Sequence, residues 1–163
     1  MQKIEQERID GVEIGCLYGD GAKTILESNP RIYLISIDPF IANSPGTPAD
    51  MVGDEATVLE KLKEYLDRFS LIVDYSWNVV GEFADDSLDF LFIDGDHSRP
   101  SVQRDFNDWV PKIKGDGLLF IHDVQLMDGP IRIKEQIENS FKWEVVDATA
   151  NLVCARKIVP KEA

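Results

Sequence analysis

The sequence has little of what secreted, membrane-spanning or nucleic-acid-binding proteins need. Its only two cysteines, Cys16 and Cys154, are too few for a disulfide framework and lack the short spacing of a zinc site. No apolar run approaches the roughly 20 residues that span a bilayer, and residues 1–10 are too polar for a signal peptide. The formal net charge of −13 disfavours a nucleic-acid partner. We therefore expect a cytoplasmic protein with reduced thiols, no membrane contact and no bound nucleic acid.

Apolar runs alternate with helical patterns along the chain, and no repeat or low-complexity segment interrupts them. This alternation predicts one α/β domain over residues 1–163, in which helices cover both faces of a mostly parallel sheet. Helical spacing predicts helices at residues 22–27, 55–69, 98–110 and 131–141. Strands are predicted at residues 12–15, 33–37, 71–73, 88–93, 118–121, 143–146 and 152–155. The last two strands must be antiparallel, because the turn between them is too short for a helical crossover.

A glycine-rich turn joins the first predicted strand to the first helix. Gly15 and Gly19 allow the backbone to turn tightly and to approach a ligand, and the amides that begin the next helix suit an anionic group. Asp38 ends the second strand, where a carboxylate can accept both hydroxyls of a ribose. Together these features favour nucleoside binding over a glycine turn with a helix-capping Asp20. The spacing fits neither a nicotinamide dinucleotide fingerprint nor a P-loop.

Acidic and histidine residues follow two further strands of the predicted sheet. Asp94, Asp96 and His97 come after the fourth strand, and His122 and Asp123 end the fifth. If these strands are neighbours, their ends lie about 5 Å apart. Asp94 and Asp123 could then share a divalent cation such as Mg²⁺, Mn²⁺ or Ca²⁺. The alternative is that these residues only shape turns and a helix start, which suits Asp96 best.

These motifs and the reversed final strand pair resemble class I S-adenosylmethionine-dependent methyltransferases over nearly the whole chain. The subgroup that the sequence resembles contains metal-dependent catechol and macrolide-sugar O-methyltransferases. The resemblance rests on the run Glu13-x-Gly15-x-x-x-Gly19, on Asp38, on Asp94-Gly95-Asp96-His97 and on His122-Asp123.

The resemblance implies a Rossmann-like methyltransferase fold, S-adenosylmethionine as cofactor and a divalent cation, with Mg²⁺ favoured. It assigns Asp94 and Asp123 to the cation, with His122 as a further ligand, and His97 as the general base. The residues that it assigns to the cofactor are Glu13, Gly15, Gly19, Asp38, Ser76, Trp77 and Asp94. In this scheme Glu13 orients the turn, and Ser76 and Trp77 flank the adenine.

The resulting hypothesis is metal-assisted O-methylation of a small hydroxylated molecule. Two departures from the family stand against it, because Val124 replaces an amide or carboxylate and only ten residues precede Gly11. The domain would then lack an N-terminal lid, and exposed Phe40, Ile41 and Leu126 would favour a homodimer or a partner protein. One alternative is a non-catalytic S-adenosylmethionine-binding module of the same fold. A nucleotide-dependent oxidoreductase is a third hypothesis, which the glycine spacing and the reversed strand pair disfavour.

Overall fold

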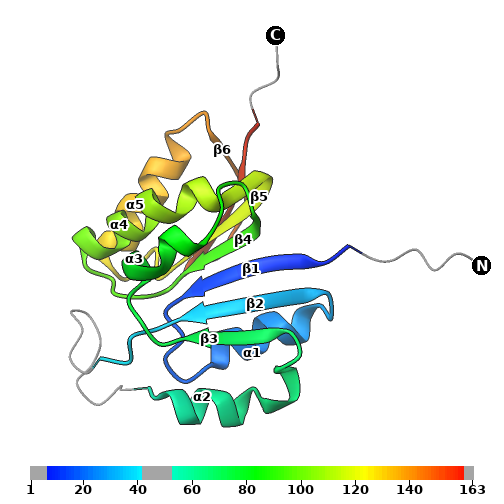
Figure 1. Ribbon diagram of the computed structural model, residues 1–163. Helices are drawn as coiled ribbons and strands as arrows, with labels where there is room; N and C mark the ends of the chain where they lie inside the picture. Colours follow the sequence, from blue (N-terminus) through cyan, green and yellow to red (C-terminus); the bar gives the residue numbers. More distant parts are fainter. Residues whose placement is uncertain (1–6, 42–52, 160–163) are drawn as a thin grey trace, which may run out of the picture.

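Within residues 7–41 and 53–159, which the computed structural model describes, seven strands form a sheet in the order β3-β2-β1-β4-β5-β7-β6 (Figure 1). The pairs β3-β2, β2-β1, β1-β4 and β4-β5 are parallel, whereas β5-β7 and β7-β6 are antiparallel. The predicted sheet and its reversed final pair are therefore confirmed. The strands are β1 (Ile9–Ile14), β2 (Ile32–Ile37), β3 (Phe69–Ile72), β4 (Leu88–Ile93), β5 (Ile113–His122), β6 (Trp143–Ala148) and β7 (Leu152–Lys157).

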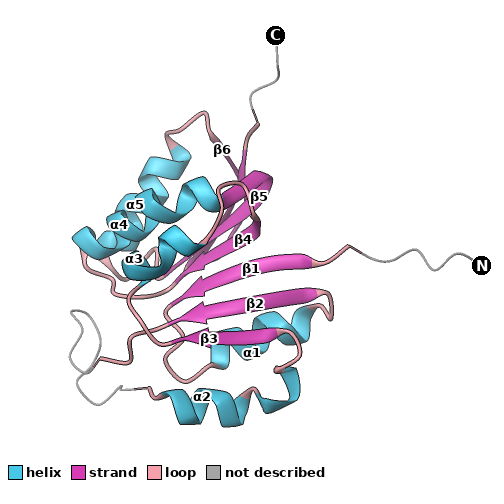
Figure 2. Cartoon of the chain, in the orientation of Figure 1, coloured by secondary structure: helices cyan, strands magenta, loops and turns pink. Residues whose placement is uncertain are grey.

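Helices cover both faces of the sheet, as predicted (Figure 2). On one face lie α1 (Asp20–Ser28) and α2 (Glu55–Lys61), and on the other lie α3 (Ser76–Val79), α4 (Arg99–Trp109) and α5 (Asp128–Glu138). Each parallel connection therefore crosses back over the sheet before the next strand begins, so the carboxyl ends of β1, β2, β4 and β5 share one edge. No helix in the described part of the chain is both long enough and apolar enough to cross a membrane.

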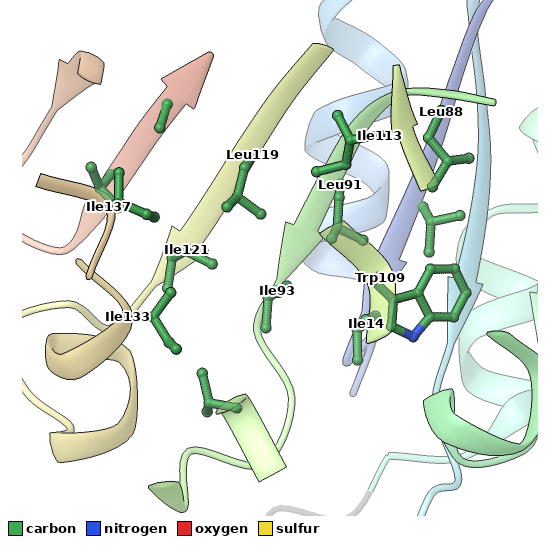
Figure 3. Packing of buried hydrophobic residues seen from close by; sticks show 14 of the residues in the cluster. Ile14, Leu88, Leu91, Ile93, Trp109, Ile113, Leu119, Ile121, Ile133 and Ile137 are labelled. Atoms are coloured by element: carbon green, nitrogen blue, oxygen red, sulfur yellow. The ribbon is translucent and has the colours of Figure 1, made fainter. Parts of the chain in front are cut away.

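The larger of the two apolar clusters lies between the sheet and the layer of α3, α4 and α5 (Figure 3). Alternate residues of each strand face this layer, as the period of two in a strand requires. They meet one stripe on each helix, including Trp109 of α4 and Ile133 and Ile137 of α5. A second cluster packs beneath α1 and α2. Cys16 and Cys154 are buried free thiols, in agreement with the prediction.

The predicted helix at residues 55–69 is wrong in its second half. The α-helix ends at Lys61, and a 3₁₀ turn follows at Lys63–Tyr65. Phe69 instead begins β3, where it pairs with Leu34 and is buried. The apolar spacing fits a helix, but burial of Phe69 in the sheet overrides that local pattern.

Other boundaries also differ from the prediction. The third strand begins two residues earlier than predicted, and β5 starts at Ile113, five residues before the predicted start at residue 118. The short helix α3 was not predicted. Residues 42–52, for which neither a helix nor a strand is predicted, lie outside the described residues.

Trp109 offers a test of this core, because its side chain is 0% exposed and packs against Phe83 with ring centroids 4.8 Å apart. We expect Trp109→Ala to lower the free energy of unfolding by about 3–5 kcal/mol, since it leaves a cavity between α4 and the sheet. Phe141 is 99% exposed, so Phe141→Ala serves as the control and should change stability by less than about 0.5 kcal/mol. Urea unfolding followed by circular dichroism measures both, and equal stabilities would contradict the assignment of this core.

Candidate active site

A cavity of ≈ 720 Å³ lies at the edge where β1, β2, β4 and β5 end. Its volume is within the range of about 300–1,000 Å³ that small-molecule sites occupy, and open α/β sheets bind ligands at this edge. Of the ten predicted site residues, Gly19 alone does not line it. The nine that do are Glu13, Gly15, Asp38, Ser76, Trp77, Asp94, His97, His122 and Asp123.

The glycine turn forms one wall of the cavity and depends on two left-handed backbone conformations. Gly15 has φ 89°, and a Cβ atom there would lie 2.3 Å from the backbone oxygen of Asp94. The turn is therefore pressed against the chain that leaves β4, which only glycine permits. Gly19 has φ 77° and occupies the N-cap position of α1. A side chain at this position would be strained by the backbone conformation, although no neighbouring atom would block it.

Asp38 ties the end of β2 to this turn. Its Oδ2 accepts hydrogen bonds from the backbone amides of Cys16 and Leu17, both at 2.8 Å, and its Oδ1 accepts one from Phe40 at 2.8 Å. A carboxylate has about four acceptor positions, so three are used by the backbone. One acceptor position of Asp38 is left for a ligand in this conformation, and its contact with a ribose stays a prediction.

Glu13 lies beneath the turn and is 1% exposed. Ser36 Oγ donates a hydrogen bond to Glu13 Oε2 at 2.5 Å. Burial raises the pKa of Glu13 to about 8, so the side chain is protonated at neutral pH. A Cβ atom on Gly21 would lie 2.7 Å from Glu13 Oε1, which places this carboxyl directly under the first turn of α1. The position is the one expected of a residue that orients the glycine turn.

Ser76 and Trp77 also line the cavity, at the start of α3. The Trp77 ring stacks on Tyr75, with centroids 4.3 Å apart and an interplanar angle of 16°. The guanidinium carbon of Arg104 lies 4.5 Å from the centroid of the same ring. Both faces of Trp77 are thus covered, so a purine can stack on it only after Tyr75 or Arg104 moves.

Asp105, a cavity residue that was not predicted, accepts a hydrogen bond from Ser76 Oγ. It is 5% exposed, and burial raises its pKa to about 6. Its place on α4 gives a signal that could have revealed it. It follows Val102 by three residues and precedes Trp109 by four, so an acid stands on the buried stripe of the helix.

A carboxylate, an imidazole and a second carboxylate meet at the ends of β4 and β5. Asp94, His97 and Asp123 each offer one ligand atom, and these atoms lie within 4.8 Å of one another. Their proximity follows from the pairing of Ile93 with Ile121, which sets the two strand ends side by side. Asp123 has φ 57°, a left-handed conformation that is costly for a residue with a side chain and that is often found at functional sites.

Two separations within this cluster, both measured from His97, suit a shared cation. His97 Nε2 lies 3.4 Å from Asp94 Oδ1 and 3.0 Å from Asp123 Oδ2, yet neither ring nitrogen makes a hydrogen bond to a described residue. Atoms about 2.1 Å from one cation stand about 3.0 Å apart in octahedral and about 3.4 Å apart in tetrahedral geometry. Burial alone would lower the pKa of His97, but the close contact with the Asp94 carboxylate and the charges of Asp123 and Asp94 outweigh it and raise the pKa. The donor set therefore fits a positive charge at its centre.

His122 lies beside Asp94 and Asp123 and also lines the cavity. Its Nδ1 is 3.1 Å from Asp94 Oδ1 and 3.5 Å from Asp123 Oδ1, and its Nε2 is 3.5 Å from Asn151 Nδ2. The structure thus places His97, the predicted base, among the candidate ligands. It places His122, the predicted ligand, in hydrogen-bond contact with Asp94.

Asp96 shapes the start of α4, in agreement with the plainer of its two interpretations. Its Oδ1 accepts a hydrogen bond from the backbone amide of Ser98 at 2.9 Å. Its Oδ2 accepts hydrogen bonds from the hydroxyls of Ser98 and Ser101. Ser98 holds the N-cap position of α4, but its hydroxyl donates to Asp96 and makes no hydrogen bond to a helix amide.

Apolar side chains near the cavity partly match the expectation that they face water. Leu126 is 70% and Ile41 is 47% exposed. Phe40 is only partly exposed, because it packs against the apolar cluster beneath α1 and α2. The homodimer or partner protein that these residues suggested stays a prediction.

Comparison with known proteins identifies the class of this domain. The sequence model of a methyltransferase domain family matches residues 12–124. That segment is more than half of the chain and contains the glycine turn and all three candidate cation ligands. The chain therefore belongs to this methyltransferase family, and its fold is that of a class I S-adenosylmethionine-dependent methyltransferase resembling O-methyltransferases.

Solved structures share this fold at low sequence identity. A methyltransferase from Geobacter sulfurreducens has a TM-score of 0.68 and 14% identity, covering 92% of this chain and 71% of its own. A provisionally assigned caffeoyl-CoA O-methyltransferase from Staphylococcus aureus has a TM-score of 0.66 and 16% identity, with coverages of 91% and 76%. A protein from Corynebacterium glutamicum has a TM-score of 0.67 and 14% identity, covering 94% of this chain and 74% of its own.

A curated relative is similar over a shorter stretch. An uncharacterized protein of Sinorhizobium fredii is 29% identical over 62 residues, which is 37% of this chain. The similarity spans only 7% of the length of that relative.

The buried Glu13 predicts an unusual pH dependence of stability. Its pKa is about 8 in the folded protein, against an ordinary value of 4.5, so the folded state binds the proton more tightly than the unfolded state. The contribution of the Glu13 proton to the free energy of unfolding is therefore fully present below pH 4.5, and it is lost as the pH rises through about 8. Glu13→Gln keeps the shape and cannot ionise. The urea midpoint of Glu13→Gln minus that of the native protein should therefore increase between pH 5 and pH 9, because only the native protein loses stability as Glu13 ionises.

Urea unfolding of both proteins across this pH range measures the effect, with the exposed Glu82→Gln as a control that should follow the native profile. Parallel profiles for Glu13→Gln and the native protein would show that Glu13 is already ionised when buried.

Proposed function

We propose that this chain transfers a methyl group from S-adenosylmethionine to a hydroxyl oxygen of a small molecule, with a divalent cation held by Asp94, His97 and Asp123. The observation that carries the proposal is the convergence of these three ligand atoms on the wall of one cavity. The same cavity is lined by the glycine turn and by Asp38, the residues expected to hold the cofactor. Cofactor and acceptor would therefore meet where β1 and β4 end side by side.

The chain's own groups would position the two reactants. The glycine turn and Asp38 would fix the nucleoside end of the cofactor, with the neutral Glu13 holding the turn from below. The carboxylates of Asp38, Asp94 and Asp123 give the cavity a negative wall, which favours the positively charged sulfonium. Methyl transfer needs the oxygen in line with the carbon–sulfur bond, so positioning would supply much of the rate enhancement.

A cation bound by this set would hold the acceptor hydroxyl and lower its pKa, so that the hydroxyl proton can pass to solvent water. Two carboxylates and one imidazole suit Mn²⁺ or another transition metal better than the Mg²⁺ favoured from the sequence. A nitrogen that holds a cation cannot also accept a proton. The geometry therefore supports His97 as a ligand, in place of its predicted role as general base.

The His97→Ala variant distinguishes these two roles. Turnover should fall in either case, by about 10²–10⁴-fold if His97 acts as a base. We expect the variant also to bind Mn²⁺ more than about tenfold more weakly, because one of three protein ligands is lost. Calorimetric titration of Mn²⁺ into both proteins gives the answer. If His97→Ala binds Mn²⁺ with native affinity but turns over slowly, His97 is the general base and not a ligand.

The cofactor assignment is tested by titration with S-adenosylhomocysteine. Asp38→Ala should weaken binding by roughly 1.5–3 kcal/mol, since a charge-assisted hydrogen bond to the ribose is lost. The exposed Asp67→Ala is the matched control and should bind as the native protein does. Equal affinities for the native protein and Asp38→Ala would remove Asp38 from the site.

Turnover is measured as S-adenosylhomocysteine formed from S-adenosylmethionine over a panel of catechols and hydroxylated sugars, with and without chelator. Formation that stops on chelation supports metal-assisted O-methylation. Tight cofactor binding without turnover on any acceptor would instead support the non-catalytic binding module.

A further inference from the structure

We infer that Asn151, in the turn between β6 and β7, is a positioning residue that aims Asp123 and Asp94 at the proposed cation. The inference rests on the proposed function, because it concerns the same three ligands. Asn151 is not among the residues that line the cavity, so it acts through its neighbours rather than on a substrate.

The side-chain amide of Asn151 joins the two carboxylates through His122. Asn151 Nδ2 donates a hydrogen bond to Asp123 Oδ1 at 2.6 Å, and it lies 3.5 Å from His122 Nε2. On its other side, His122 Nδ1 is 3.1 Å from Asp94 Oδ1. A continuous path of polar contacts thus runs from Asp123 through Asn151 and His122 to Asp94.

This path fixes the orientation of each group. An amide nitrogen can only donate, so His122 Nε2 faces it as the acceptor and Nδ1 carries the proton towards Asp94. Because Asn151 holds Asp123 Oδ1, the other oxygen, Oδ2, is left facing His97 Nε2 at 3.0 Å. The two histidines therefore have separate tasks, with His97 among the ligands and His122 in the frame that orients them.

The reversed strand β7 explains why a residue of this turn reaches the site. His122 pairs with Leu152 in the antiparallel β5–β7 ladder, so the residue before Leu152 stands beside the end of β5. The backbone amide of Val124 also donates to the backbone oxygen of Asn151 at 3.4 Å. If β7 ran parallel to β5, the β6–β7 turn would lie at the opposite edge of the sheet, and an amide from that turn could not reach Asp123.

Asn151 also offsets the repulsion between the two acids. Asp94 and Asp123 are like charges at adjacent strand ends, and a carboxylate without a partner can rotate away from its neighbour. Carboxylates that bind metals are generally held by such hydrogen bonds, and loss of one typically lowers metal affinity by about 10–100-fold. The residue after Asp123 in the chain is Val124, whose side chain cannot donate a hydrogen bond. The side-chain amide that contacts Asp123 belongs to Asn151.

The test is calorimetric titration of Mn²⁺ into protein saturated with S-adenosylhomocysteine, for the native chain, Asn151→Ala and Asn151→Leu. The second variant keeps the side-chain volume without the amide. Thr149→Ala is the control, because Thr149 Oγ1 accepts from the backbone amides of Asn151 and Leu152 and so supports the same turn without touching the acids. Circular dichroism and unfolding midpoints establish that each variant folds.

Both Asn151 variants should bind Mn²⁺ about 10–100-fold more weakly, and their affinity for S-adenosylhomocysteine should stay within about twofold of native. Thr149→Ala should keep the native affinity for both ligands. Native Mn²⁺ affinity in the Asn151 variants, or an equal loss in Thr149→Ala, would overturn the role of the amide and leave the proposed function standing. A native protein that binds S-adenosylhomocysteine but no Mn²⁺ would overturn the proposed cation, and this inference with it.

Discussion

The site depends on one constraint, which is that two carboxylates end neighbouring parallel strands. The register of β4 and β5 pairs Ile93 with Ile121, so Asp94 and Asp123 emerge at the same edge of the sheet. Their like charges would repel, and the surrounding groups offset this repulsion. His97 approaches both acids, His122 contacts Asp94, and Asn151 contacts Asp123. A cation is the strongest offset that this geometry can accept.

The glycine turn, on the cofactor side of the cavity, packs directly against the backbone of one of the two acids. Gly15 lies against the backbone of Asp94, with no space for a Cβ atom between them. The backbone amide of Asp94 in turn donates to the oxygen of Ile14 at 2.8 Å. The glycine turn and the acidic strand end are therefore parts of one rigid edge. This contact explains how residues separated by about 80 positions can set the distance between a cofactor and an acceptor.

Sequence reasoning succeeded where one rule of topology decides the outcome. Alternating strands and helices predict a parallel sheet, and a parallel sheet brings strand ends such as Asp38, Asp94 and Asp123 together. It failed where the outcome depends on pairings between distant segments. Phe69 fits a helical stripe and a strand equally well, and its pairing with Leu34 decides between them.

The distribution of roles within the site was beyond sequence reasoning for the same reason. Which histidine joins the two acids as a candidate ligand depends on side-chain directions at a strand end, which sequence spacing does not fix. The contribution of Asn151 depends on the register of β7 against β5, which places Leu152 opposite His122. The burial of Asp105 has a sequence signal, but its hydrogen bond to Ser76 depends on the unpredicted helix α3.

The most direct test of the central claim is anomalous X-ray diffraction at the manganese edge, from crystals grown with Mn²⁺ and S-adenosylhomocysteine. We predict one strong peak about 2.1–2.3 Å from His97 Nε2 and from a carboxylate oxygen of Asp94 and of Asp123. The cofactor should lie beside it, along the glycine turn. Bound S-adenosylhomocysteine with no peak at these residues in millimolar Mn²⁺, or a peak on His122 in place of His97, would contradict it.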